Sequence, residues 1–272
     1  MRRLVMAMMV AGAAQAAQAA DLPDFSALRG PVGISRGVVN WQGFYAGGQA
    51  GYGSSDMNFS GATSDLASQL LWGTTIETEG HVSQWPVLGR KSQQGHGYGG
   101  FAGYNSQWDD IVLGIEANYM HGAFGGSDSN TKSLSFSTSD GYTNGVTYQS
   151  NAKFNITDMG SVRARAGYAV GSFLPYAFGG VSLGRANIAK SVSISGTQVN
   201  PSATPPFNNI NFSLAAATSQ NGRFIYGYAA GLGLDMMLWG NIFARAEWEY
   251  LKFAGPVDTS INTFRGGLGY KF

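Results

Sequence analysis

The chain has 272 residues, of which 44% are hydrophobic and 12% charged, with a formal net charge of +1 and no cysteine. Soluble domains usually contain about 25% charged residues. The near-neutral balance gives no reason to expect a nucleic-acid partner. Without cysteine, no disulfide can hold the fold together, so packing or a closed hydrogen-bond ladder must do so.

The N-terminal residues predict a signal peptide. Arg2 and Arg3 precede an apolar run from Leu4 to about Ala14, and a small-x-small cleavage site follows at residues 17–19. The apolar run is too short to span a membrane, so residues 1–19 are expected to be removed. Loss of two arginines from the 17 basic residues leaves 15 against 16 acidic ones. Residues 20–40 carry scattered proline and glycine and predict a periplasmic N-terminal segment, with a barrel domain over residues 41–272.

From residue 41 onward, apolar and aromatic residues alternate with glycine, polar and charged residues, as expected for strands with two different faces. In residues 261–272, Phe264, Leu268, Tyr270 and Phe272 fall on one face. The register of residues 174–185 is ambiguous, and a bulge at residues 179–180 would explain it. Eight strands are predicted, over residues 41–52, 95–107, 111–121, 154–168, 174–185, 223–235, 242–253 and 261–272.

The connections between these segments are alternately short and long. No apolar run of about 18 residues follows the signal, which excludes a helical membrane protein. The pattern instead predicts an all-β fold: an eight-stranded antiparallel up-and-down transmembrane β-barrel with long extracellular loops and periplasmic termini. Residues 134–137 and 146–149 flank turn sequences, so the neighbouring strands are expected to continue beyond the membrane as a hairpin. Residues 192–195 could do the same.

Charged residues gather on the predicted inward faces. An eight-stranded lumen is just wide enough to be filled by side chains, and unpaired buried charges are costly, so these groups are expected to form paired networks. Two interpretations remain open, a narrow polar path that selects ions and a salt-bridged plug. The predicted lumen charge network comprises Glu116, Arg163, Arg165, Arg245, Glu247, Glu249 and Arg265.

Other candidate sites are weaker. A two-residue turn at residues 108–109 would place His96 opposite His121 at the outer rim, where a haem or metal could bind, although polar rim residues are the favoured interpretation. Residues 95–100 match GxGxxG by letters, but no helix follows. No histidine lies inward at mid-depth, which argues against a hydrolase inside the barrel. Ser127, Asp128 and His121 leave a rim hydrolase as a minor alternative.

Several segments resemble the alphaproteobacterial outer-membrane β-barrel family often labelled porin family, which includes small surface-antigen barrels. The resemblance covers residues 41 to the end except the loops. It is carried by WQGFYAGG at 41–48, AGY at 50–52, GGFAGYN at 99–105, GIEA at 114–117, GSVRARAGY at 160–168, PYAFGG at 175–180 and GLGYKF at 267–272. The ending, with Leu268, Tyr270 and Phe272, is similar to the signal that the barrel assembly machinery reads. Family members have structural, antigenic, small-pore or haemin-binding assignments.

Together these observations predict a structural and surface-interacting barrel of the outer membrane, with no catalysis, no cofactor and no metal. Its expected partners are outer-membrane lipid and lipopolysaccharide, the barrel assembly machinery and a host or surface ligand bound through the loops. A small general porin is the first alternative, and haem or metal binding at His96 and His121 is the second.

Overall fold

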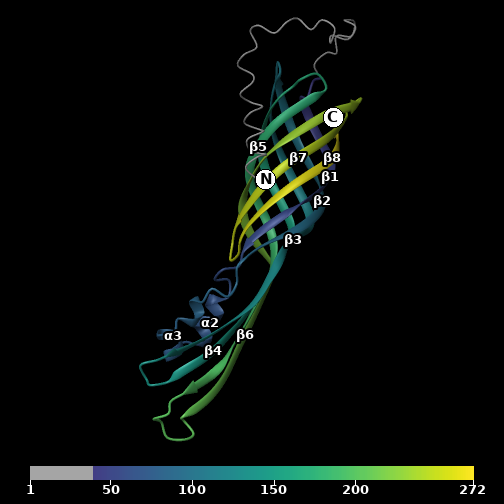
Figure 1. Cartoon of the computed structure of the whole chain (residues 1–272). Coiled ribbons are helices and arrows are strands. Elements are labelled where there is room, and N and C mark those ends of the chain that lie inside the picture. The colour runs from purple at the N-terminus through teal and green to yellow at the C-terminus, as the bar shows by residue number, and fades with distance from the viewer. Residues whose placement is uncertain (1–38) are drawn as a thin grey trace, which may run out of the picture. The chain divides into compact units, whose positions relative to one another are not determined.

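The computed structural model describes residues 39–272, so the predicted signal peptide and nearly all of the predicted periplasmic segment lie outside the described residues. Eight antiparallel strands pair in chain order and close into a barrel, because β1 also pairs with β8 (Figure 1). The predicted up-and-down barrel is therefore confirmed. The strands are β1 (Gly43–Asn58), β2 (Arg90–Trp108), β3 (Ile111–Ser137), β4 (Thr143–Tyr168), β5 (Phe173–Val199), β6 (Asn209–Trp239), β7 (Ile242–Ala254) and β8 (Asp258–Lys271).

Three short turns join β2 to β3, β4 to β5 and β6 to β7. Each begins with a residue of positive φ, namely Asp109, Gly171 and Gly240, a conformation that glycine and aspartate adopt most readily. The first turn spans residues 109–110, because Trp108 pairs with Ile111. The turn predicted at residues 108–109 was therefore wrong by one residue.

That difference moves the whole β2–β3 register by two positions. His96 lies opposite Ala123, and His121 lies opposite Tyr98, so the two histidines do not face each other as the earlier turn would require. The register shift follows directly from turn position, since every pairing in a hairpin is counted from its turn.

Aromatic side chains form two outward bands with aliphatic residues between them, as expected for a membrane-spanning barrel. Exposed aliphatic residues of this middle zone include Ile115, Val181 and Leu232. The band near the short turns contains Phe44, Tyr104, Trp108, Tyr168, Phe173, Trp239, Tyr270 and Phe272; the band toward the long connections contains Tyr52, Tyr98, Tyr119, Phe224, Tyr226, Tyr228 and Phe264.

The expected bulge at residues 179–180 is wrong. Pairing of β5 with both neighbours runs unbroken through this position. Tyr176 and Phe178 are buried, whereas Val181 and Leu183 are exposed, so the alternation is regular and the two aromatic rings point into the lumen. The register shift lies instead between Ala186 and Ile188.

Four strands continue past the barrel. Beyond Ala123, β3 has no pairing with β2, and before Tyr226, β6 has none with β7. Pairing among β3, β4, β5 and β6 nevertheless continues to the hairpin ends (Figure 1). This four-stranded sheet is here called the extension and comprises residues 124–137, 143–156, 186–199 and 209–223. It contains the hairpins that the turn sequences predicted, but its strands are much longer than expected.

One face of the extension is covered by residues 59–89, here called the cap. The cap contains α2 (Ser64–Leu70), α3 (Thr75–Thr78) and the 3-10 helix η3 (Val82–Gln84). No helix within residues 39–272 is long and apolar enough to cross a membrane. Cap and sheet share a hydrophobic cluster that buries Leu66, Ala67, Leu71, Ile76, Val82, Val87, Val146, Tyr148, Val192 and Ile194.

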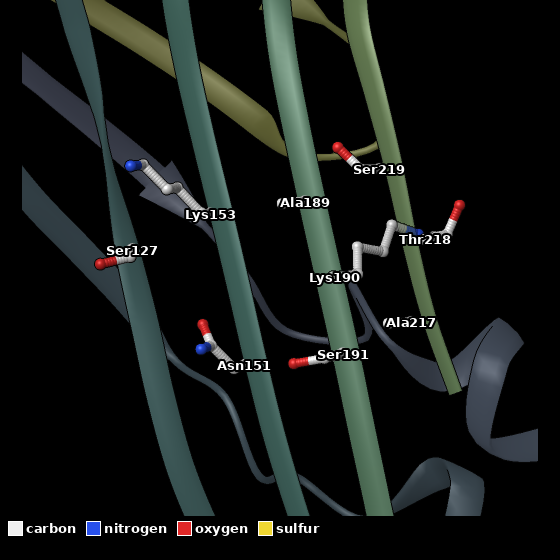
Figure 2. A pocket seen from close by; sticks show the side chains of 9 residues that line it. All are labelled: Ser127, Asn151, Lys153, Ala189, Lys190, Ser191, Ala217, Thr218 and Ser219. Carbon is white, nitrogen blue, oxygen red and sulfur yellow. The ribbon is translucent and has the colours of Figure 1, made fainter. Parts of the chain in front are cut away.

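The opposite face of the extension is open and consists mostly of small polar residues. A hollow of about 520 Å³ lies on this part of the sheet. Figure 2 shows the side chains that line it, among them Asn151 and Lys153. Odd-numbered positions supply the open face, because the even-numbered positions, such as Tyr148 and Ile194, pack against the cap. Pairs of open-face residues include Ser133 with Thr147 and Thr147 with Ser195.

Candidate functional site

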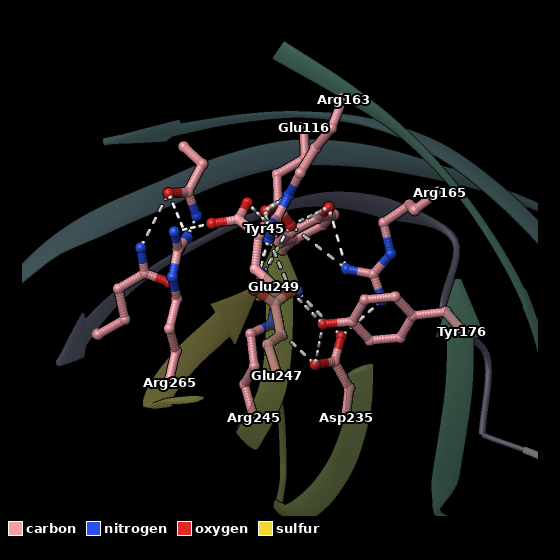
Figure 3. Close-up of polar contacts among 12 residues, drawn as sticks. Tyr45, Glu116, Arg163, Arg165, Tyr176, Asp235, Arg245, Glu247, Glu249 and Arg265 are labelled. Atoms are coloured by element: carbon pink, nitrogen blue, oxygen red, sulfur yellow. Dashed lines mark hydrogen bonds and ion pairs between the residues drawn. The ribbon is translucent and has the colours of Figure 1, made fainter. Parts of the chain in front are cut away.

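The structure places all seven residues of the predicted charge network in the barrel lumen, together with Asp235 (Figure 3). They lie on five strands, β3, β4, β6, β7 and β8. Four carboxylates, from Glu116, Asp235, Glu247 and Glu249, meet four guanidinium groups. The cluster is therefore balanced in formal charge, which the seven predicted residues alone would not be.

Arg163 and Arg245 are the centres of the network. Arg163 forms ion pairs with Glu116, with Glu247 at 2.6 Å and with Glu249 at 3.2 Å. Arg245 contacts Glu116 at 2.6 Å and Asp235 at 2.8 Å. Glu116 thus joins the two arginines, and no carboxylate of the cluster depends on a single strand for its neutralisation.

Arg165 and Arg265 complete the network on either side. Arg165 pairs with Asp235 at 2.7 Å, and Arg265 pairs with Glu249. Arg265 also donates to Asn118 Oδ1 at 2.9 Å. Because each buried charge has both an opposite charge and hydrogen-bond partners, the cost of removing it from water is offset.

Aromatic residues pack around the guanidinium groups. The centre of the Arg165 guanidinium lies 3.7 Å from the ring centroid of Tyr176, and that of Arg163 lies 4.0 Å from that of Phe178. The Tyr45 hydroxyl donates to Glu116 at 2.8 Å. These contacts fill the space between charged groups with cation–π and hydrogen-bonding partners, leaving little room for water.

Every charged residue of the network is at most 5% exposed, and Glu116 and Glu249 are fully buried. On the side of the short turns, an aromatic layer that includes Trp41 and Phe243 packs below the charges. On the extracellular side, an apolar layer that includes Phe124, Phe154 and Phe253 packs above them. The charged groups therefore lie between two apolar layers.

Sequence reasoning missed three members of this site, Asp235, Tyr45 and Tyr176. Asp235 ends a predicted strand and is in phase with the inward Gly231 and Gly233, so its alternation could have revealed it. Tyr45 is likewise in phase with Gly47 and Gln49, on the face opposite Phe44, whereas Tyr176 was harder to assign because the register of its strand was ambiguous and an aromatic ring in a barrel strand is typical of the lipid face. No local pattern distinguishes a tyrosine that donates to a lumen carboxylate.

The rim histidines lie on the outward face. His121 Nδ1 is 2.9 Å from Asp158 Oδ1, and its ring packs edge-on against Tyr98, with centroids 5.7 Å apart. His96 is exposed on the neighbouring strand. Within residues 39–272, no group of three or more His, Cys, Asp or Glu side chains is positioned to hold a metal ion.

Leu268, Tyr270 and Phe272 also face outward, at 59%, 47% and 71% exposure. The Tyr270 and Phe272 rings pack edge to face, with centroids 5.2 Å apart. These side chains are accessible from the lipid side of the closing strand.

A closed barrel with lipid-facing aromatic bands and a charged interior defines an outer-membrane β-barrel protein. Residues 4–272 match the family model described as outer membrane protein beta-barrel domain, and the chain belongs to this family.

Two similar proteins come from alphaproteobacteria, as the resemblance predicted. The 25 kDa outer-membrane immunogenic protein of Brucella ovis is 28% identical over 174 residues, which cover 64% of this chain and 62% of the Brucella protein. The 22 kDa outer membrane protein of Rhizobium leguminosarum bv. viciae is 25% identical over 245 residues, covering 86% of this chain and 79% of that protein. The chain thus spans less than two thirds of the length of the Brucella relative.

Solved structures of small barrels are more distant. The attachment invasion locus protein Ail of Yersinia pestis matches with 15% identity and a TM-score of 0.32, covering 85% of this chain and 99% of Ail. Neisserial surface protein A matches with 12% identity and a TM-score of 0.35, covering 84% of this chain and 97% of that structure.

Proposed function

We propose that this outer-membrane protein is a closed barrel whose lumen charge network is a structural plug, and that it acts through surface interactions of its extension. The observation that carries the proposal is burial. A side chain lining a water path would be exposed to water, whereas none of the eight charged residues is more than 5% exposed. Apolar layers above and below the network further oppose passage of ions.

The extension supplies the surface for this role. It is built from the long ends of four strands and carries a folded cap. Loops that only connected strands would need neither feature, because surface connections are usually short. The name of the Brucella ovis relative describes it as immunogenic, which fits exposure at the cell surface. Outer-membrane lipid and lipopolysaccharide are the proposed surroundings of the barrel wall and the base of the extension.

We assign Leu268, Tyr270 and Phe272 as the signal for the barrel assembly machinery, in line with their shared outward face. Neither a porin nor a haem or metal receptor is favoured by a specific contact. His121 is already engaged by Asp158, and His96 and His121 lie two positions apart in register.

Solute uptake tests the proposed function. Proteoliposomes that contain the folded protein should swell in small sugars no faster than protein-free liposomes, while proteoliposomes with a known porin swell rapidly. Correct folding is checked by the difference in gel migration between unheated and boiled samples. Swelling above the protein-free rate by the correctly folded barrel would contradict the closed-lumen proposal.

A further inference from the structure

The extension has two outer edges, one along β3 and one along β6. Along residues 124–137 of β3, the Gly89 N–H donates to Asp128 at 2.8 Å and Lys91 pairs with Asp128 at 3.4 Å. Trp85 of the cap packs against Phe136, with ring centroids 6.1 Å apart. Residues 124–137 of β3 thus meet the cap through the side chains of Asp128 and Phe136, and they carry two charged residues, Asp128 and Lys132.

The other edge is β6 over residues 209–221. Pairing between β6 and β7 starts only at Tyr226 with Ala254. Within the described residues, no backbone–backbone hydrogen bond joins residues 209–221 to any segment other than β5. All of these residues are exposed or half-buried. An unpaired edge of this length presents a row of free N–H and C=O groups that can template another strand.

The register identifies which backbone groups are free. The Asn200 N–H donates to the Asn208 carbonyl at 3.0 Å, which makes this facing pair a hydrogen-bonded one. Such pairs alternate along an antiparallel ladder, so even-numbered residues of this part of β6 bond to β5. The N–H and C=O groups of odd-numbered residues, including Ser213, Ala215 and Ala217, point away from the sheet.

The composition of this edge lacks the usual protection against pairing. Residues 209–221 contain no charged residue and no proline, although natural edge strands commonly carry lysine, proline or a bulge to prevent association. On the cap side, Phe212, Leu214 and Ala216 already pack against the hydrophobic cluster. A strand added next to β6 would therefore extend the hydrophobic cluster on the cap side of the sheet. On the open face it would extend the surface of small polar side chains.

We propose that the β6 edge, residues 209–221, pairs antiparallel with the same edge of a second copy of this chain in a facing outer membrane. The proposal rests on the proposed surface-interaction function and names its partner. Free groups at strand spacing can all be satisfied only by another extended polypeptide. When the same edge of a second copy pairs with residues 209–221, no like charges meet. The side chains that face each other near Ala215 are small.

The arrangement in facing membranes follows from symmetry. A two-fold dimer within one membrane has its axis along the membrane normal, which preserves the component of each strand along that normal. Antiparallel pairing reverses this component. Because β6 continues from a tilted membrane-spanning strand, two symmetric copies pair antiparallel only across two membranes. Each pair buries little, but many pairs between two surfaces add their strengths through avidity.

Vesicle clustering tests this inference with the intact protein. Two vesicle populations with different fluorescent labels, both carrying the folded barrel, should cluster with each other and not with protein-free vesicles. Ala215→Pro removes one free donor without touching a β5 bond, since proline is tolerated at strand edges. Ala215→Lys places like charges at the pairing centre. Both variants should lose clustering.

Ser193→Lys is the matched control. Ser193 lies directly opposite Ala215 on the same open face, but it belongs to the central strand β5, so clustering should persist. A single cysteine at Ala215→Cys has no competing thiol in this chain. A short bis-maleimide should therefore crosslink it into dimers only when both populations carry the variant.

Several results would overturn the pairing: absence of clustering by the folded protein, clustering with protein-free vesicles, retention of clustering in both Ala215 variants, or equal loss with Ser193→Lys. Swelling measured on the same vesicles separates the two proposals. A barrel that passes sugars yet clusters through Ala215 would contradict the closed lumen and leave the edge pairing intact.

Discussion

At the residue scale, Arg163 shows how the lumen tolerates buried charge. One guanidinium contacts three carboxylates, from Glu116, Glu247 and Glu249, and stacks on Phe178. Removing one member of such a group is costly, because the remaining charges stay buried without compensation. The network thus links several strands, because each buried charge is neutralised by residues of other strands.

Replacing Arg163 should consequently destabilise the barrel strongly. We expect Arg163→Met to lower the free energy of unfolding by about 3–5 kcal/mol, since three carboxylates lose a partner. Urea unfolding in detergent micelles, followed by gel migration, measures this change. Lys153→Met, at an exposed position of the extension, should leave the unfolding midpoint unchanged. Equal stability of the Arg163 variant and wild type would refute the structural role of the network.

Gly233 makes room for a lumen tyrosine. A Cβ at this position would collide with the Tyr176 ring, whose hydroxyl donates to Glu247. We expect Gly233→Ala to lower the free energy of unfolding by about 1–3 kcal/mol through overpacking. Gly266 has no neighbour within 4 Å of such a Cβ, so Gly266→Ala is the matched control and should be close to neutral. The same urea series decides, and two variants with indistinguishable midpoints would contradict the close packing.

Residue-level prediction succeeded where alternation was clean. Strand phase alone located the inward arginines and glutamates, because successive side chains of a strand point to opposite faces, so the phase assigns each residue to one face. It could not reveal which partners meet, since ion pairs such as Arg245 with Glu116 join strands far apart in the sequence. The functional importance of these network residues stays a prediction, which the variants described above test.

At the element scale, the cap belongs to two clusters: its helices pack on the extension, whereas Phe59, Ala62 and Leu88 join the apolar layer of the lumen. Leu71 is fully buried in the cap cluster, whereas its neighbour Trp72 is 87% exposed. We expect Leu71→Ala to destabilise the cap by about 2–5 kcal/mol and to expose residues 59–89 to protease. Trp72→Ala should not. Barrel migration on unheated gels should be unchanged in both, and a cap that resists protease after Leu71→Ala would argue against this packing.

Asp140 joins the β3–β4 hairpin tip to α3. A hydrogen bond from Thr138, together with one from Thr75, holds the pKa of Asp140 below its ordinary value of 3.8. A carboxyl with a lowered pKa stabilises the fold above its unfolded pKa and loses that contribution as pH falls through its folded pKa. The tip should therefore loosen only in strong acid, below about pH 4.

Carboxyl NMR titration measures this directly. The Asp140 midpoint should lie below 3.8, and Thr138→Val should raise it, because the Thr138 hydroxyl is the main cause of the shift. Thr143→Val removes a nearby hydroxyl that hydrogen-bonds Ser137 and is not among the causes of the Asp140 shift, so it should leave the midpoint in place. A wild-type midpoint at or above 3.8 would show that these hydrogen bonds do not form.

Prediction of the strands and helices from the sequence also differed between the barrel and the part outside the membrane. Inside the membrane, alternation and short turns were sufficient to predict eight strands and their order. Outside it, the cap helices α2 and α3 were not predicted, because they are only 7 and 4 residues long and depend on packing against the sheet. Short helices gain most of their stability from tertiary contacts. The β2–β3 register failed for a different reason: turn position is a one-residue choice that alternation cannot make.

At the scale of the whole molecule, the barrel and the extension differ in how their strand edges are treated. Closure removes strand edges inside the membrane, where unpaired backbone groups are most costly. The extension reopens two strand edges outside it, one along β3 and one along β6. Unpaired backbone groups of strand edges therefore lie only beyond the closed part of the barrel within the described strands.

Single-channel recording in planar bilayers tests the closed lumen most directly. The mature folded chain should give no discrete conductance steps, because the eight charged side chains are buried between two apolar layers. Heat-modifiable migration confirms that the silent protein is folded. Reproducible steps whose size changes when Glu116 or Arg163 is substituted would contradict the account and show that the charge network lines an open ion path.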